Sequence, residues 1–346
     1  MTLETGVDLE YDGDTGRHDR DASELTMDAL SDVLRVAQLT GGVFLNAEFT
    51  APWCLAARMA PELCAPLLGA AAHFVPYHYV MQGEMRVATE GAQPVQLQAG
   101  DIVLFPRNDL HIMGSDESLT PTSVREILQH CRGAGPHYIQ HGGGGAATRL
   151  VCGYLGCASA SGNPVFATLP AMIQMRIEQA GAAGWFRAVF EYAAGELLAT
   201  QPGSDTVLAK ISELLFVEAV RRYTQLLPEQ ETSWFAGLRD KTVSRALALM
   251  HGNVARDWDV DQLAREVGLS RSALADRFGR LIGTPPMQYL AQWRMQLAAH
   301  SLRTTTLPLA RIAEQIGYES EAAFSRAFKK AFGAAPATWR RRNAGH

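Results

Sequence analysis

The sequence contains few cysteines and no long apolar run. Its five cysteines are odd in number, and the one close pair is Cys152 and Cys157, so we expect reduced thiols rather than a disulfide framework. No apolar run reaches the roughly 18 residues of a membrane span. Seven acidic residues lie between Asp8 and Glu24, which is unlike the basic start of a signal peptide. These absences predict a cytoplasmic protein with no membrane partner.

A strong overall charge is also absent, but the charge is unevenly distributed along the chain. The net charge of −5 over 346 residues would by itself argue against a polyanionic partner. From Leu238 to the carboxyl terminus, however, 17 Lys and Arg stand against 9 Asp and Glu, which is a net charge of +8 and leaves −13 for the preceding residues. A basic segment joined to an acidic one is expected when one end of a chain binds nucleic acid.

The length and the pattern of apolar residues predict an α+β protein with about two packed domains. Residues 1–22 are acidic and polar and predict a mobile tail. Short apolar runs between Gly, Pro, Asn and Asp across 23–168 are typical of antiparallel strands in a β-barrel or sandwich. Apolar residues recur every three or four positions across 169–227 and predict helices, 228–238 reads as a linker, and 239–342 is expected to be all-helical.

Two features of these segments leave their role open or argue against a ligand site. The helices expected at 169–227 would form a dimer face or pack on their own barrel, and both arrangements give the same apolar stripe. Four consecutive glycines follow His141, with no lysine and no strand-to-helix setting for a phosphate loop, so we expect a flexible excursion there.

The most informative pattern is a near-repeat in the last hundred residues. One copy runs from Leu263 to Pro286 and the other from Ile312 to Pro336. Each has an Ala-x-x-x-Gly turn, a serine before the next helix and Gly-x-x-Pro after that helix. The alanine is small enough for a helix crossing, the glycine suits a left-handed turn, and the serine can cap the next helix. The repeat therefore predicts two helix-turn-helix units.

The residues that would read DNA follow from helix geometry. If Leu274 and Phe278 point inward in the first unit, and Phe324 and Phe328 in the second, a step of about 100° per residue defines the opposite faces. Arg326 could form a bidentate bond with guanine. The candidates for base contacts are Arg271, Ser272, Ala275, Asp276, Glu321, Ala322, Ser325 and Arg326.

The segment between the two units predicts a rigid spacer. Pro286 at a helix start and an apolar stripe reaching Ser301 indicate a helix of about four turns, long enough to hold the units about 25 Å or more apart. This spacing suits successive major-groove segments, which lie about 34 Å apart. The phosphate-contact candidates, which together predict steep weakening of binding with salt, are Arg280, Arg294, Arg311, Lys329, Lys330, Arg340, Arg341 and Arg342.

These paired motifs resemble the AraC family of transcription regulators over about Asp240 to Arg340, most specifically in Ile316 to Ser320 and Phe324 to Lys330. The resemblance implies one chain that binds a long double-stranded DNA site with both units, with reading positions at 272, 275, 276, 321, 322 and 326. Asp276 departs from the family, whose members commonly carry a basic or amide residue at that position.

A second motif, from Gly100 to His111, resembles the second signature of the cupin barrel, which is Gly, five residues, Pro, a residue, usually Gly, two residues and His. Asn108 replaces the usual glycine and tolerates the same left-handed turn. The segment Tyr79 to Glu84 resembles the end of the first cupin signature.

The metal ligands of the cupin family are largely missing. Where metal-binding cupins have a glutamate this chain has Pro76, and the histidine places fall on Gly69 to Ala72, so of the four expected ligands only His111 remains. A single histidine cannot hold a catalytic metal, which needs three protein ligands. We therefore expect no metal, no cofactor and no enzymatic activity.

With Ala51 to Trp53 and Leu150 to Leu155, the whole chain resembles the cupin-type AraC regulators. The resemblance implies a regulator that responds to a small-molecule effector in its barrel, works as a homodimer and, if it is an activator, contacts RNA polymerase. The effector-pocket candidates, each of which could equally be a packed barrel residue, are Trp53, Tyr77, His78 and His111.

Three other functions stay open at this point. Cys54, Cys152 and Cys157 could sense oxidants, although no adjacent Lys or Arg indicates a lowered pKa. A cupin metalloenzyme with a DNA anchor and an architectural DNA binder without effector control are the remaining alternatives.

Overall fold

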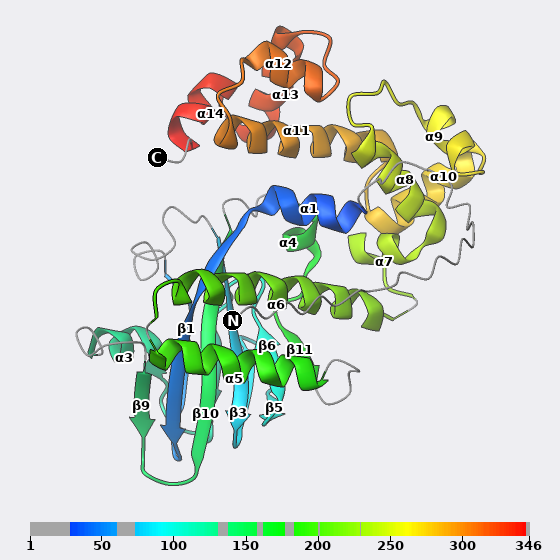
Figure 1. The fold of residues 1–346 in the computed structure, drawn as a ribbon. Coiled ribbons are helices and arrows are strands. Elements are labelled where there is room, and N and C mark those ends of the chain that lie inside the picture. Colours follow the sequence, from blue (N-terminus) through cyan, green and yellow to red (C-terminus); the bar gives the residue numbers. More distant parts are fainter. Residues whose placement is uncertain are drawn as a thin grey trace, which may run out of the picture.

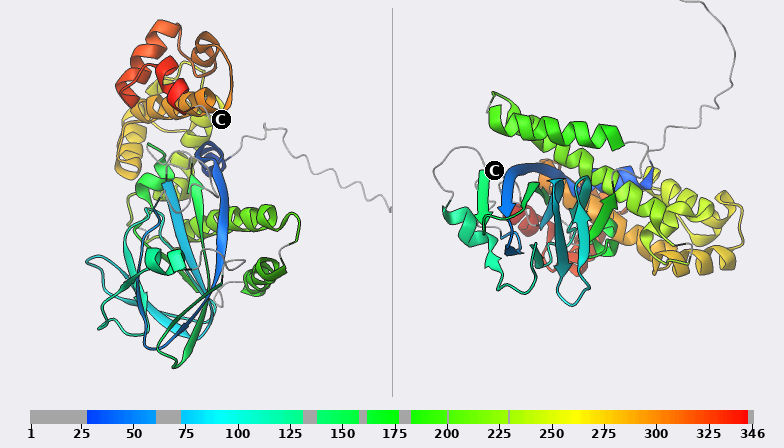
Figure 2. Two further views of the ribbon diagram at one scale, coloured as in Figure 1. Left: turned by 90° about the vertical axis from the view of Figure 1, so that its left-hand side faces the viewer. Right: turned by 90° about the horizontal axis from the view of Figure 1, so that it is seen from below.

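The computed structural model describes residues 28–60, 73–130, 138–157, 162–176, 183–199, 201–228 and 230–343. A sheet domain with flanking helices is followed by a helical region, which gives the α+β architecture expected from the sequence (Figure 1). The helical region lies at one end of the sheets (Figure 2). The tail predicted at 1–22 lies outside the described residues. Among the described residues, no helix is both long and apolar enough to cross a membrane.

Two sheets enclose an apolar core that contains Phe49, Leu55, Val80, Met113 and Leu150. The larger sheet has the order β11-β6-β3-β10-β1-β9 and the smaller has the order β5-β4-β7-β2-β8. The strands of the larger sheet are β1 (Leu39–Thr50), β3 (His73–Gln82), β6 (Asp101–Leu104), β9 (Tyr138–Gly142), β10 (Ala147–Cys157) and β11 (Ile173–Arg176). Those of the smaller are β2 (Cys54–Ala57), β4 (Glu84–Thr89), β5 (Val95–Gln98), β7 (His111–Gly114) and β8 (Thr122–Ser123).

Helices cover the outer face of the larger sheet. On α6, Leu215, Phe216, Ala219 and Val220 are buried, and both α5 and α6 contact β1, as Figure 1 shows. The helices of this domain are α1 (Ala29–Ala37), α3 (Val124–His130), α4 (Pro164–Thr168), α5 (Ala183–Ala199) and α6 (Ser204–Leu226).

The segment that the sequence predicts to be helical from 169 onward begins with a strand instead. Residues Ile173–Arg176 form the edge strand β11, which pairs with β6. Ile173 and Met175 are buried whereas Arg176 is exposed, a period of two that is typical of a strand. Four residues are too few for this period to stand out against the helical pattern of the residues that follow.

The four glycines after His141, where the sequence predicts a flexible excursion, form a segment that is hydrogen-bonded to the backbone at the end of β1. They link β9 to β10, both of which pair with β1. Gly143 N donates to Thr50 O at 2.8 Å and Gly145 N to Ala51 O at 2.8 Å. Gly142 has φ +132°, and a Cβ there would lie 1.9 Å from Thr50 O. Glycine is needed because the link packs tightly against the backbone at the end of β1.

The helical region begins with α7 inside the segment that the sequence indicates as a linker. Trp234 and Phe235 anchor this helix because both are buried. The helices of this region are α7 (Trp234–Arg239), α8 (Lys241–Gly252), α9 (Val260–Glu266), α10 (Arg271–Ile282), α11 (Pro286–Thr304), α12 (Leu309–Gln315), α13 (Glu321–Phe332) and α14 (Pro336–Asn343).

The helices of the helical region belong to two different apolar cores. One cluster runs from Val75 and Leu104 of the sheet domain through to Phe278 and Trp293. A separate cluster holds Phe324 and Phe328 with residues of α11 and α12. The helices around α10 therefore share a core with the sheet domain, whereas α12 and α13 have their own.

Candidate nucleic-acid interface

The two predicted turns are present, with the glycines in the left-handed conformation. Gly268 has φ +73° and Gly317 has φ +77°. At Gly317 a side chain would also be excluded sterically, because a Cβ would lie 2.6 Å from Ala255 O. Each turn is closed by a bond to the predicted alanine, from Leu269 N to the carbonyl of Ala264 and from Tyr318 N to that of Ala313, both at 2.9 Å.

The serines after these turns cap the next helices, as expected. Ser270 Oγ accepts from Ala273 N at 3.3 Å, and Ser320 Oγ accepts from Ala323 N at 3.2 Å. Each cap satisfies a backbone N–H that the first turn of a helix leaves unpaired. The sequence pattern thus specifies where α10 and α13 begin.

The orientation of the two helices agrees with the helical-wheel prediction. Leu274, Phe278, Phe324 and Phe328 are fully buried. Of the base-contact candidates, Ser325 is half-buried, and the exposed ones are Arg271, Ser272, Ala275, Asp276, Glu321, Ala322 and Arg326. Two of them are engaged within the protein: Arg271 Nη1 lies 3.0 Å from Asp261 Oδ2 on α9, and Ser272 Oγ lies 3.3 Å from Ser270 Oγ.

Helix α11 connects the two units and is longer than expected. It has 19 residues and therefore extends about 28 Å, against the four turns predicted. It begins at Pro286, as predicted, and buries Leu290, Trp293 and Leu302. Because these residues belong to both apolar clusters, α11 is packed along its length.

The phosphate-contact candidates fall into two groups. Arg294 donates to the carbonyls of Val254 and Arg256, at 3.0 and 2.8 Å, and Arg340 donates to that of Leu307 at 2.6 Å. Arg311 pairs with Glu314 on its own helix. The carbonyls that Arg294 and Arg340 meet are more than thirty residues away in the sequence, so no local pattern predicts these contacts. The candidates that are simply exposed are Arg280, Lys329, Lys330, Arg341 and Arg342.

Of the four effector-pocket candidates, the structure brings two together. His78 Nε2 lies 3.0 Å from His111 Nε2, and both rings line a small cavity of about 40 Å³ between the sheets. Tyr77 instead bonds through its hydroxyl to Ser212 Oγ of α6 at 3.1 Å. Neighbouring residues of a strand face opposite sides of the sheet, which separates Tyr77 from His78. Trp53 is buried against Phe49, with ring centroids 4.5 Å apart.

Burial keeps this histidine pair neutral. It lowers the pKa of His78 well below the ordinary value, with the neighbouring His111 acting in the same direction. Burial also lowers the pKa of His111 to about 4. The hydrogen bond between the His111 ring and the Asp109 carbonyl acts to raise this pKa, but its effect is smaller. His78 Nδ1 has no hydrogen-bond partner among the described residues.

Neither the cysteines nor the acidic residues form a chemical site in the described part of the chain. Cys54, Cys152 and Cys157 are buried thiols, and Cys157 Sγ donates to Ala37 O at 3.0 Å. Burial raises the pKa of the Cys152 thiol to about 12, which disfavours the reactive thiolate. Cys64 and Cys131 lie outside the described residues. Within the described ranges, no three His, Cys, Asp or Glu side chains are grouped to hold a metal ion.

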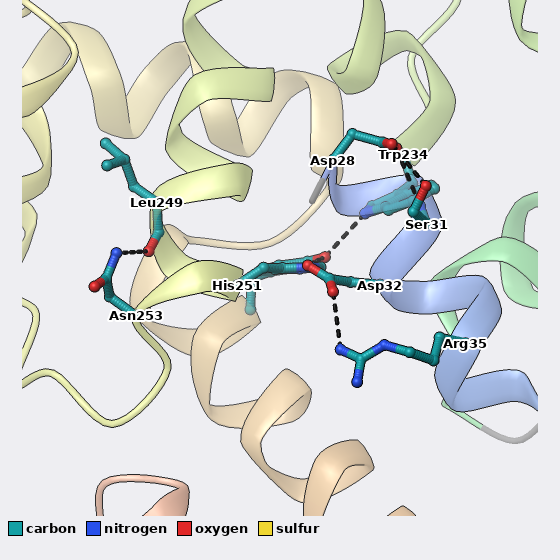
Figure 3. Close-up of polar contacts among 9 residues, drawn as sticks. Asp28, Ser31, Asp32, Arg35, Trp234, Leu249, His251 and Asn253 are labelled. Carbon is teal, nitrogen blue, oxygen red and sulfur yellow. Dashed lines mark hydrogen bonds and ion pairs between the residues drawn. The ribbon is translucent and has the colours of Figure 1, made fainter. Parts of the chain in front are cut away.

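A polar contact joins the sheet domain to the helical region, and sequence reasoning missed it. Asp32 of α1 lies between His251 of α8 and Arg35 (Figure 3). His251 Nδ1 is 3.6 Å from Asp32 Oδ2, beyond ordinary hydrogen-bond length, while Nε2 is 2.9 Å from Tyr289 Oη. The His251 ring stacks on Trp293 with centroids 4.2 Å apart. No sequence signal links Asp32 to a residue more than two hundred positions away.

Comparison with known proteins agrees with this architecture. Residues 28–225 match the cupin family, and residues 263–342 match the helix-turn-helix domain family. A putative AraC-like transcription regulator from Streptomyces antibioticus is 28% identical over 319 residues, which cover 91% of this chain and 99% of that protein. The HTH-type transcriptional regulator AlkR from Acinetobacter baylyi is 27% identical over 319 residues, covering 92% of this chain and 100% of AlkR.

Among solved structures, a transcriptional regulator with an AraC-type DNA-binding domain from Chromobacterium violaceum is 28% identical. The match covers 30% of this chain and 92% of the chain in that structure, with a TM-score of 0.29. The cupin match alone spans more than half of the chain. The chain belongs to the AraC family of transcription regulators, with an amino-terminal cupin domain and a carboxy-terminal helix-turn-helix DNA-binding region.

Proposed function

We propose that this transcription regulator reads a specific operator with α10 and α13 and changes its activity when a small molecule binds between its two sheets. We further propose that it works in the cytoplasm as a homodimer and has no enzymatic activity of its own. The observation that carries the DNA proposal is the exposure of the two helix faces opposite Phe278 and Phe328, which are fully buried. Buried aromatic rings fix the rotation of each helix, so its outer face is presented in one orientation.

Arg326 is the residue to which we assign the strongest base contact. It is exposed on α13, four residues before Lys330 and three before Lys329. A guanidinium can donate two bonds to the major-groove edge of guanine, whereas the exposed neighbours Glu321 and Ala322 offer an acceptor and a methyl group. Arg341 lies on α14, outside the reading helices, and we assign it to phosphate.

Arg326→Ala should weaken binding to the operator by about 1–3 kcal/mol and relax the preference at one base position. The measurement is a titration on an operator selected in vitro and on random DNA of the same length. Arg341→Ala is the matched control, because it removes the same charge and should lower affinity for both DNAs and flatten the salt dependence. Equal losses on both DNAs for both variants would contradict the assignment.

The effector proposal rests on the buried histidine pair. Two neutral imidazoles in an otherwise apolar cavity are costly to bury, and His78 Nδ1 finds no partner within the described part of the chain. A ligand with one polar group and an apolar body would satisfy this nitrogen. The cavity of about 40 Å³ would have to widen, and Met59 and Met113 in its lining are side chains that change rotamer readily. A crystal structure should show a small molecule beside His78; a cavity that holds only water would contradict the proposal.

The dimer proposal rests on apolar side chains that the sheet domain leaves uncovered. Trp185 and Tyr192 of α5 are 43% and 52% exposed, and Leu214 of α6 is 48% exposed. The opposite faces of both helices pack on the larger sheet, so the helices serve their own domain and still present an apolar surface. Sedimentation should give a dimeric mass for the natural chain and a monomeric mass for Tyr192→Asp; identical masses would contradict this interface.

A further inference from the structure

A large cleft lies where the helical region meets the sheet domain. Its volume of about 740 Å³ is within the range of small-molecule sites. One wall is α4 of the sheet domain, and the other walls come from α11 and from α13. The lining includes Pro164 and Thr168 from α4, Gln288, Gln292 and Met295 from α11, and Ala327, Lys330, Ala331 and Phe332 from α13. The cleft is separate from the cavity that holds His78 and His111.

The lining of this cleft combines aromatic surface with one cation. Trp234, Tyr289 and Trp293 contribute aromatic rings. Among the described residues that line it, Lys330 is the one charged side chain, and it is exposed. The glutamine side chains of α11 add hydrogen-bonding groups between these two regions. Such a lining is suited to a molecule with an apolar, flat body and a negative group.

The two indoles of the lining differ in their polar contacts. Trp234 Nε1 donates to Tyr289 Oη at 3.0 Å. Trp293 is 3% exposed, and its Nε1 is buried with no hydrogen-bond partner among the described residues. Because these N–H groups are buried or already paired, the indoles offer a ligand ring surface rather than a hydrogen-bond donor.

Lys330 differs from Lys329 in whether it lines the cleft. Lys329 and Lys330 follow Arg326 on α13 by three and four residues, so both lie beside the DNA-reading face. Lys330 lines the cleft together with Ala327 and Ala331, whereas Lys329 is not part of the lining. Lys330 is therefore the cation of α13 that a ligand in the cleft can meet.

We propose that this cleft binds an organic anion with an aromatic body, such as an aromatic carboxylate or sulfonate. The anion pairs with Lys330, and the aromatic body packs on the rings beside Trp293. This site is additional to the effector cavity and does not depend on it.

A ligand here would couple the two parts of the protein. It touches α4 and α13 at once, and therefore favours the arrangement in which the second helix-turn-helix unit lies against the sheet domain. If operator DNA prefers a different placement of α13, ligand and DNA weaken each other by the same factor.

The test uses the full chain and 8-anilinonaphthalene-1-sulfonate, an aromatic anion whose fluorescence reports binding. The natural chain should bind one molecule saturably, and Lys330→Gln should weaken this binding at least fivefold. Lys329→Gln is the matched control, since it removes the same charge one residue away and should change the affinity less than twofold. Equal weakening by both substitutions, or no saturable binding by the natural chain, would overturn the proposal.

A second variant tests the location without changing any charge. Ala291 is exposed on α11 and lines the cleft, so Ala291→Trp should fill part of it and weaken binding of the same probe at least tenfold. Ala92→Trp, in the exposed turn between β4 and β5 and outside the lining of the cleft, is its control and should leave probe binding unchanged. Operator binding measured in parallel separates failure of this site from failure of the DNA proposal. Unchanged probe affinity in Ala291→Trp would place the bound probe elsewhere and contradict the inference.

Discussion

Phe328→Ala should destabilise the second helix-turn-helix unit by about 3–5 kcal/mol. The Phe328 ring is fully buried, and its centroid lies 4.6 Å from that of Phe332 and 5.7 Å from those of Phe324 and Trp339. Alanine would remove the centre of this aromatic group and leave a cavity that the surrounding rings can only partly fill. A loss of this size would populate locally unfolded α12 and α13.

The effect should remain local because of how the cores are divided. Phe328 belongs to a cluster confined to the end of α11 and the helices that follow, whereas Phe278 belongs to the cluster that continues to Val75 and Leu104. Hydrogen exchange should therefore rise in α12 and α13 of Phe328→Ala while β3 and β6 stay protected. In the matched variant Phe278→Ala, protection should fall in the sheet domain as well. Exchange that rises throughout the chain in Phe328→Ala would show that the two cores unfold together.

Acidification from pH 7 to pH 4 should remove several kcal/mol of folding stability, because buried histidines are held neutral. Burial lowers the pKa of His111 from the ordinary 6.5 to about 4. At about 1.4 kcal/mol per pH unit, His111 alone then contributes about 3 kcal/mol of this loss. Burial also lowers the pKa of His78, of His251 and of His300.

The sign follows from proton uptake in the two states. Between pH 6.5 and the lowered pKa, the unfolded chain binds a proton at each of these histidines and the folded chain does not. The stabilisation is thus complete above pH 6.5 and is lost as the pH falls toward the folded pKa. At His251, Asp32 acts in the opposite direction but does not offset burial. Burial acts to raise the pKa of Asp32, but the contacts with His251 and Arg35 outweigh it and lower this pKa, so the contribution of Asp32 to stability is lost only at lower pH.

Urea unfolding at pH 6.5 and pH 5 checks this prediction above the range where most carboxylates titrate. His111→Leu cannot take up a proton at this position, so its stability should fall less over the interval than that of the natural chain. The half-buried His141 offers a control, and His141→Leu should keep the full pH dependence because it lies beside the glycine link rather than in a core. An unchanged slope in His111→Leu would show that His111 is not a source of the acid sensitivity.

Several assignments could not be made from sequence because they depend on partners far along the chain. Tyr77 and His78 are both apolar-flanked ring residues in the sequence, yet one bonds to Ser212 on a covering helix and the other to His111 inside the sheets. Arg294 and Lys330 were both predicted to contact phosphate. In the structure Arg294 bonds to the loop before α9, whereas Lys330 stays exposed and also lines the cleft.

The sequence by itself determined the two helix-turn-helix units, their caps and their outward faces, because a left-handed glycine, a capping serine and an apolar stripe act over a few residues. The tertiary structure alone decided how the sheet domain and the first unit share one core, how Asp32 meets His251, and which arginines bond to distant backbone carbonyls. Those features come from contacts between residues tens to hundreds of positions apart. Such contacts leave no local pattern, since their geometry exists only after the sheets and helices have packed.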